Sequence, residues 1–141
     1  MPSAPSHDLR VVLDTNVYFS ALTHPLGAPF QLWRKAIIRR YTLLTSPAIM
    51  QEAAKVLRVK GGWQEAQIVS YLKLLARIAE IITPRLTLRV ILEDEADNRI
   101  LECALAGNAH LIVSGDYHLR RLKAFRGIGI VRPIDLQRTL G

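Results

Sequence analysis

Short apolar runs that alternate with amphipathic stretches constrain the fold of this chain more than any other feature. The runs LRVVLD and HLIVS are rich in β-branched residues and too short for a helix, so each predicts a buried strand. YTLLT, EIIT and IGIV predict further strands, and LRVIL a further extended segment. Because strands and helices alternate, we expect an α/β fold with three layers, α/β/α, around a mainly parallel central sheet.

Capping signals mark where some of the helices begin. Ser46 can serve as an N-cap, and Pro47 fits the first helical position of a helix that runs to about Arg58. Pro133 opens the closing helix PIDLQRTL in the same way. The other helices are expected in NVYFSAL, APFQLWRKAIIRR, the stretch from Trp63, ADNRILECALAGN and the basic segment YHLRRLKAF.

Length and composition fit one globular domain with a basic surface. The chain has 141 residues, half of them apolar, which suffices for a substantial core. We expect residues 1–8 to form a mobile tail and residues 9–141 a single domain. The formal net charge of +7 favours polyanionic partners such as nucleic acid.

Cysteine usage and hydropathy indicate the cell compartment. Cys103 is the only cysteine, so no intrachain disulfide can form, and we expect this thiol to pack inside a helix in a reducing compartment. No apolar run approaches the ~20 residues that a membrane helix needs, and the first residues do not resemble a secretory leader. The sequence therefore predicts a cytoplasmic protein with no membrane association.

Four acidic residues fall where an α/β fold places its functional crevice. Asp14 and Asp116 follow two of the expected strands, and ligands bind outside the carboxyl ends of such strands. Asp97 is in helical register with apolar positions and is expected to project from the inward face of its helix. Glu52 lies at the edge of an apolar helical stripe, from which it can lean over the sheet.

Carboxylates that converge in one crevice repel each other unless cations compensate them. A set of oxygen ligands favours Mg²⁺ or Mn²⁺ over zinc. Such ions lower the pKa of an attacking water and stabilise a leaving oxygen, so the pattern indicates hydrolysis of phosphodiester bonds.

The segments VVLDTNVYFSAL, DEADNRILECALA and HLIVSGDYHL, with the helix that carries Glu52, resemble the PIN-domain ribonucleases. The resemblance is closest to the VapC-like toxin components of toxin-antitoxin pairs, and it spans Leu9 to about Asp135. It implies a PIN-like α/β/α fold, metal-dependent endoribonuclease activity with Mg²⁺ or Mn²⁺, an RNA substrate, a cognate antitoxin protein that silences the enzyme, and a homodimer.

The same resemblance assigns roles by position. It implies that the four acids Asp14, Glu52, Asp97 and Asp116 are catalytic and hold the metal. Two polar residues, Asn16 and Ser114, match positions that orient the acids or a metal-bound water, as residues around a metal site commonly do.

Each acid also has a local alternative role. Asp97 or Asp116 could cap a helix, Asp14 could end its strand in a turn, and Glu52 could be a solvated helix residue. Asp94 lies one turn before Asp97 and could be a cap, a further ligand or neither.

One basic cluster is a candidate for contacts to a phosphate backbone. Arg120, Arg121 and Lys123 follow Asp116 directly, and we expect them to contact RNA, although a solvated face is the simpler interpretation of any such cluster. The cluster of Lys55, Arg58 and Lys60 is interpreted as a solvated helix face.

Other functions were weighed against the nuclease. A haloacid dehalogenase-type phosphatase needs a second Asp two residues after the first, where this chain has Asn16. A receiver-like phosphoacceptor needs an acidic pair near the end of the first strand, whereas in this chain His7 and Asp8 precede that strand. The main alternative is a non-catalytic RNA-binding or antitoxin-binding module on the same fold, since a fold does not guarantee activity.

Overall fold

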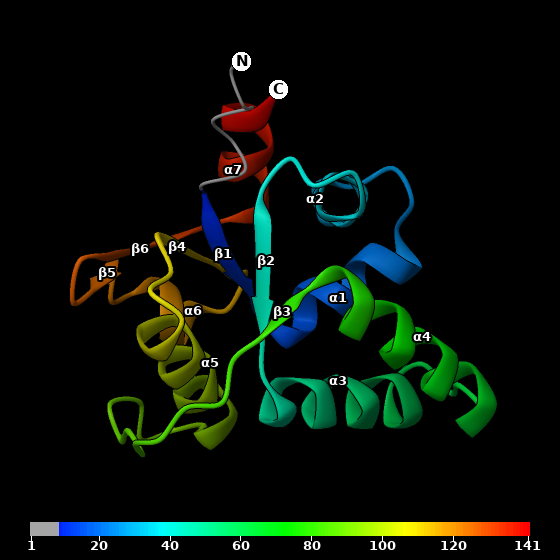
Figure 1. Ribbon diagram of the computed structural model, residues 1–141, viewed down its shortest axis with the longest axis horizontal. Coiled ribbons are helices and arrows are strands. Elements are labelled where there is room, and N and C mark those ends of the chain that lie inside the picture. Colours follow the sequence, from blue (N-terminus) through cyan, green and yellow to red (C-terminus); the bar gives the residue numbers. More distant parts are fainter. Residues whose placement is uncertain (1–8) are drawn as a thin grey trace.

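The fold is described by a computed structural model that covers residues 9–141, and the expected tail at residues 1–8 lies outside them. Helices and strands alternate along the chain as the sequence predicts (Figure 1). The elements are β1 (Arg10–Leu13), α1 (Thr15–Thr23), α2 (Ala28–Ile37), β2 (Thr42–Thr45), α3 (Pro47–Val59), α4 (Glu65–Ile78), β3 (Glu80–Ile81), α5 (Glu95–Ala106), β4 (Leu111–Val113), α6 (Tyr117–Arg120), β5 (Ala124–Phe125), β6 (Ile128–Val131) and α7 (Pro133–Leu140).

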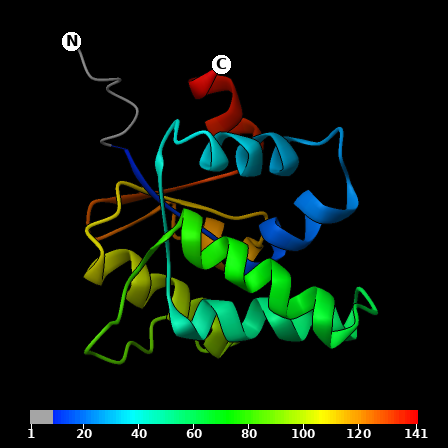
Figure 2. The same ribbon diagram turned by 45° about the vertical axis from the view of Figure 1, so that its right-hand side comes forward.

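The strands form a six-stranded sheet in the order β3-β2-β1-β4-β6-β5. All neighbouring pairs are parallel except β5 with β6, which confirms the predicted α/β class and mainly parallel sheet. Helices α1 to α4 lie to one side of β1 and β2 in Figure 1, and α5 and α6 lie to the other. The turned view in Figure 2 shows α3 and α4 running beside each other, in agreement with their packing contacts.

The centre of the core is β1, which is covered on both faces. Val11 and Val12 are fully buried, as expected for a β-branched strand in the middle of a parallel sheet. Cys103 is also fully buried and unbridged, which confirms its predicted packing role. Among the helices of residues 9–141, none combines the length and the apolar character needed to cross a membrane.

Two predicted elements differ from those observed. LRVIL, residues 88–92, forms no strand and belongs to an irregular connection between β3 and α5. The basic helix predicted in YHLRRLKAF ends at Arg120, because Lys123 has a φ of 60° and Ala124–Phe125 then turns into β5. There the chain pairs with β6 across a turn that contains Gly127 at a φ of 84°, a conformation that glycine adopts readily.

Candidate active site

Strands β1 and β4 bring two of the predicted acids to one edge of the sheet. The two strands are parallel neighbours, with Leu13 opposite Val113, and the backbone N–H of Asp14 donates to the carbonyl of Val113 at 2.9 Å. Asp14 is buried at the end of β1, and Asp116 follows the end of β4 by three residues. The carboxyl end of the sheet therefore carries both acids, as the sequence predicts.

Ser114 connects these two acids. Its hydroxyl donates to Oδ2 of Asp14 at 2.7 Å, and its Oγ accepts a hydrogen bond from the backbone N–H of Asp116 at 2.9 Å. Ser114 is fully buried, so this hydroxyl has no competing water. Asn16 lines the same hollow from the first turn of α1, with its side chain exposed.

Asp116 caps the short helix α6, since its Oδ1 accepts from the backbone N–H of His118 at 2.6 Å. The capping role considered for this residue is therefore present. A carboxylate has two oxygens that can each accept more than one bond, so a cap leaves capacity for a metal ion.

Helix α5 begins earlier than the sequence suggests, and this changes the role of Asp97. Asp94 is the N-cap, with Oδ1 accepting from the backbone N–H of Ala96 at 2.9 Å. Asp97 therefore lies inside the first turn and does not cap the helix. It is 3% exposed, and its Oδ2 has no hydrogen-bond partner within residues 9–141.

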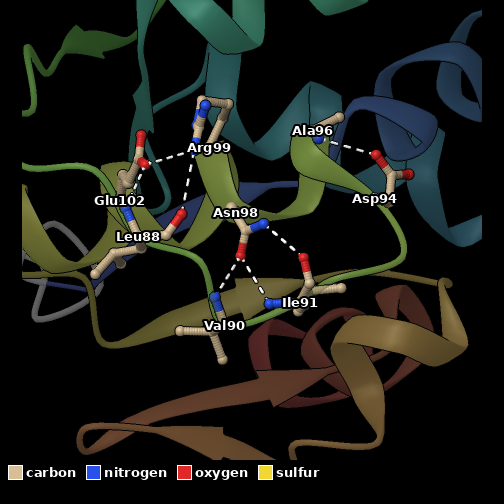
Figure 3. Close-up of polar contacts among 8 residues, drawn as sticks. All are labelled: Leu88, Val90, Ile91, Asp94, Ala96, Asn98, Arg99 and Glu102. Carbon is tan, nitrogen blue, oxygen red and sulfur yellow. Dashed lines mark hydrogen bonds and ion pairs between the residues drawn. The ribbon is translucent and has the colours of Figure 1, made fainter.

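The segment that precedes α5 is held in place by polar side chains of the helix itself (Figure 3). Asn98 is buried, and its Oδ1 accepts from the backbone N–H groups of Val90 and Ile91 at 2.9 and 2.8 Å. Its amide also donates to the carbonyl of Ile91 at 2.6 Å. One turn later, Glu102 accepts from the backbone N–H of Leu88 at 2.8 Å.

Sequence reasoning missed Asn98 and Glu102. The signal that could have identified them is the presence of two polar residues among the apolar positions of the inward helix face, where an unpaired polar group is costly. Because Asn98 follows Asp97 directly, its three hydrogen bonds also fix the turn of helix that carries the acids.

A hollow of about 260 Å³ contains all the predicted acids. Within residues 9–141, three acids have ligand atoms that all lie within 4.8 Å of one another, namely Asp94, Asp97 and Asp116. Asp14 and Glu52 line the same hollow outside this group. Ser114 holds one oxygen of Asp14, and Glu52 stands on the wall formed by α3, where its Oε2 is buried without a hydrogen-bond partner in the described chain.

The electrostatics of the hollow disfavour charge on the two most buried acids. Burial, the charge of Asp116 and the charge of Asp14, in that order, raise the pKa of Asp97 to about 7. Burial raises the pKa of Asp14 to about 6, with the hydrogen bond from Ser114 acting against the rise and the charge of Asp116 adding to it. Ionisation of these two carboxyls is thus costly unless a cation compensates the charge.

The donor set fits a divalent cation. The oxygens are carboxylates, and one buried Asp97 oxygen lacks a partner among the described residues. Burial, with repulsion from the neighbouring acids added to it, raises the pKa of Asp97. A hard cation such as Mg²⁺ or Mn²⁺ prefers oxygen ligands, would give the unpaired Asp97 oxygen a partner and would compensate the charge of the acids.

The cations that line the hollow differ from those expected. Lys55 and Lys60 of the α3 region line it, whereas Arg120, Arg121 and Lys123 do not. Arg121 forms an ion pair of 2.7 Å with Glu93. The contact of Arg120, Arg121 and Lys123 with RNA remains a prediction.

Comparisons with known proteins agree with this geometry. The family model of the PIN domain matches residues 10–118. Uncharacterized protein MJ1680 of Methanocaldococcus jannaschii is 31% identical over 121 residues, which cover 82% of this chain and 76% of that protein.

Two solved structures share the fold. One is the structure of VapBC2 from Rickettsia felis bound to a DNA fragment from the VapBC2 promoter. It has a TM-score of 0.61 at 20% identity, over 86% of this chain and 97% of that chain. The PIN domain endonuclease Utp24 has a TM-score of 0.55 at 18% identity, over 86% of this chain and 82% of that chain. The PIN-domain resemblance found in the sequence is confirmed, and the chain belongs to the PIN-domain family.

Proposed function

We propose that this protein is a metal-dependent endoribonuclease that hydrolyses RNA phosphodiester bonds. The observation that carries the proposal is the acid cluster of Asp94, Asp97 and Asp116, in which one Asp97 oxygen is buried and unpaired within the described chain. The cluster lies at the carboxyl end of the sheet, where open α/β folds bind their ligands. The likeness to the PIN domain endonuclease Utp24 supports nuclease chemistry.

The residues divide the work by position. Asp97 and Asp116 would hold Mg²⁺ or Mn²⁺, with Asp94 as a further ligand beside its capping bond. When bound, such an ion supplies an activated water and stabilises the leaving oxygen. Asp14 and Glu52 face the same hollow and would accept hydrogen bonds from the attacking water and orient it.

Ser114 and Asn16 would act on the acids and on the water. Ser114 fixes Oδ2 of Asp14 by a bond of 2.7 Å and so orients this carboxylate in the hollow. Asn16 lines the hollow with an amide that can donate to a phosphate oxygen or accept from water.

We further propose that the protein is the toxin of a toxin-antitoxin pair and forms a homodimer. The fold shared with VapBC2 supports an antitoxin partner. An open hollow of about 530 Å³ along α4, lined in part by Trp63, Tyr71 and Leu74, supplies an apolar surface of the kind that protein partners cover.

The test is an RNA cleavage assay with a defined chemical readout. The purified chain, freed of any antitoxin, is incubated with a mixed RNA pool and Mg²⁺ or Mn²⁺, and the new ends are mapped by sequencing. We expect internal cleavage that a chelator and the variant Asp14→Asn both abolish. Metal-dependent RNA binding without new ends would contradict the proposal and favour the non-catalytic binding module.

A further inference from the structure

One face of α3 forms a wall of the acidic hollow. Glu52, Lys55, Val56, Val59 and Lys60 all line it. Their spacing of i, i+3, i+4, i+7 and i+8 is that of a single stripe along a helix. The stripe therefore presents one acid, two cations and two apolar side chains to whatever enters the hollow.

The two lysines of this stripe are free to bind an anion. Neither Lys55 nor Lys60 forms an ion pair with any residue of the described chain, although carboxylates line the same hollow. Arg58, which lies between them in sequence, is instead engaged by Glu65 at 2.6 Å. Lys55 and Lys60 are thus cations that line the hollow of the acids without an ion pair in the described chain.

A second hollow of about 350 Å³ adjoins the first. The two share Thr15, Glu52, Lys55 and Ala96, so they form one continuous trough that passes over α3. Lys55 stands at the junction of the two hollows. A chain molecule bound at the acids can therefore extend past Lys55 without leaving the trough.

We propose that the α3 stripe is the wall along which a single RNA strand lies, with Lys55 and Lys60 each neutralising a phosphate that flanks the scissile one. The inference rests on the RNA substrate proposed above and adds the path of the strand. The charges along the trough support this path. Acids that hold a cation would attract the scissile phosphate, and the two lysines would attract the phosphates on either side of it.

The shape of the stripe also favours a single strand. Val59 is 73% exposed, so it offers an apolar surface to a sugar or an unstacked base. Single strands also expose bases that can be splayed against protein side chains.

The experiment measures binding rather than cleavage. The probe is a fluorescein-labelled oligouridine of about 12 nucleotides, within the range that single-strand sites occupy. Its dissociation constant is measured by anisotropy against NaCl concentration, with Ca²⁺ in place of Mg²⁺, and a gel confirms that the probe stays intact. The test variant is Lys55→Gln/Lys60→Gln, and circular dichroism verifies its fold.

We expect this variant to bind the probe roughly 10- to 30-fold more weakly at ~0.1 M salt, and the slope of log K against log[salt] to fall in magnitude by about 1.4. Lys55→Arg/Lys60→Arg should retain the wild-type slope because it keeps both charges. Lys73→Gln/Arg77→Gln on α4 removes the same charge away from the trough and should leave the slope unchanged.

Two results would overturn the inference: a wild-type slope in Lys55→Gln/Lys60→Gln, or an equal loss in the α4 control. The binding data also stand apart from catalysis. A protein that shows the lysine-dependent slope and never cuts RNA upholds the inference and refutes the proposed activity. RNA cleavage by the wild type, together with an unchanged slope in Lys55→Gln/Lys60→Gln, would uphold the proposed activity and refute the inference.

Discussion

The hydroxyl of Ser114 donates to Oδ2 of Asp14 at 2.7 Å while its oxygen accepts from the backbone N–H of Asp116 at 2.9 Å. One buried side chain therefore sets the positions of acids that follow two different strands. This arrangement orients the carboxylate of Asp14 and holds the backbone of Asp116 before any ion binds, and such preorganisation is what a catalytic metal site requires.

Ser114→Ala tests this link. The change leaves a buried Asp14 oxygen without its partner, so we expect a loss of about 1–3 kcal/mol in the free energy of unfolding. The bond from Ser114 also lowers the pKa of Asp14, so its removal should raise that pKa further and move the acid limb of the RNA cleavage profile to higher pH. Urea unfolding and a pH-rate profile measure the two effects.

Ser46→Ala is the matched control for Ser114→Ala. Ser46 is equally buried, and its Oγ accepts from the backbone N–H of Ile49 at 3.2 Å as the N-cap of α3. This variant should lose stability by about 1 kcal/mol and keep the wild-type pH profile. Equal profile shifts in both variants would show that Ser114 has only a structural role.

The raised pKa values predict how the metal-free protein responds to pH. Asp97 has a folded pKa of about 7 against an ordinary value of 3.8, so the folded state holds a proton that the unfolded state releases. The stabilisation that Asp97 contributes is fully present below pH ~4 and is lost as the pH rises through ~7. The free energy of unfolding falls by up to about 4 kcal/mol over this range. Thermal unfolding in chelator should therefore give a lower Tm at pH 8 than at pH 5.

Asp97→Asn should flatten this dependence and raise the Tm of the metal-free protein at pH 8, because the amide cannot ionise. Asp135→Asn is the control, since Arg132 holds the pKa of Asp135 below its ordinary value and the expected pH dependence has the opposite sign. A wild-type pH dependence in Asp97→Asn would mean that ionisation of this carboxyl does not cause the loss of stability at high pH.

Asn98→Ala should free the segment before α5. Two backbone N–H groups and one carbonyl lose their partner, and we expect a loss of roughly 2–4 kcal/mol. Hydrogen exchange should accelerate at Val90 and Ile91. Glu102→Ala should instead accelerate exchange at Leu88, and identical exchange patterns in the two variants would refute the separate roles.

Much of this site could be predicted from the sequence, because it depends on strand ends. Asp14 and Asp116 follow apolar runs that are unmistakable strands, and parallel neighbours bring their carboxyl ends together. The start of α5 could not be fixed so well. Asp94 and Asp97 are both reasonable caps by residue type, and the packing of the preceding segment decides between them.

Two of the errors come from tertiary contacts that leave no mark in the sequence. LRVIL is apolar enough for a strand, but its N–H groups bond to Asn98 and not to a neighbouring strand, and such side-chain partners leave no periodic signal. The basic wall was missed for a similar reason. Lys55 and Lys60 look like a solvated helix face until the packing of α3 turns that face toward the acids.

The most direct test of the central claim is a Mn²⁺ titration of the antitoxin-free chain, followed by the electron paramagnetic resonance signal of free Mn²⁺. The account predicts saturable binding by the wild type and by Asp135→Asn, with binding by Asp97→Asn weakened at least about tenfold, the loss expected when a group at a metal site is removed. Equal Mn²⁺ affinity in all three proteins would contradict it, because the acids around Asp97 would then not be the metal site.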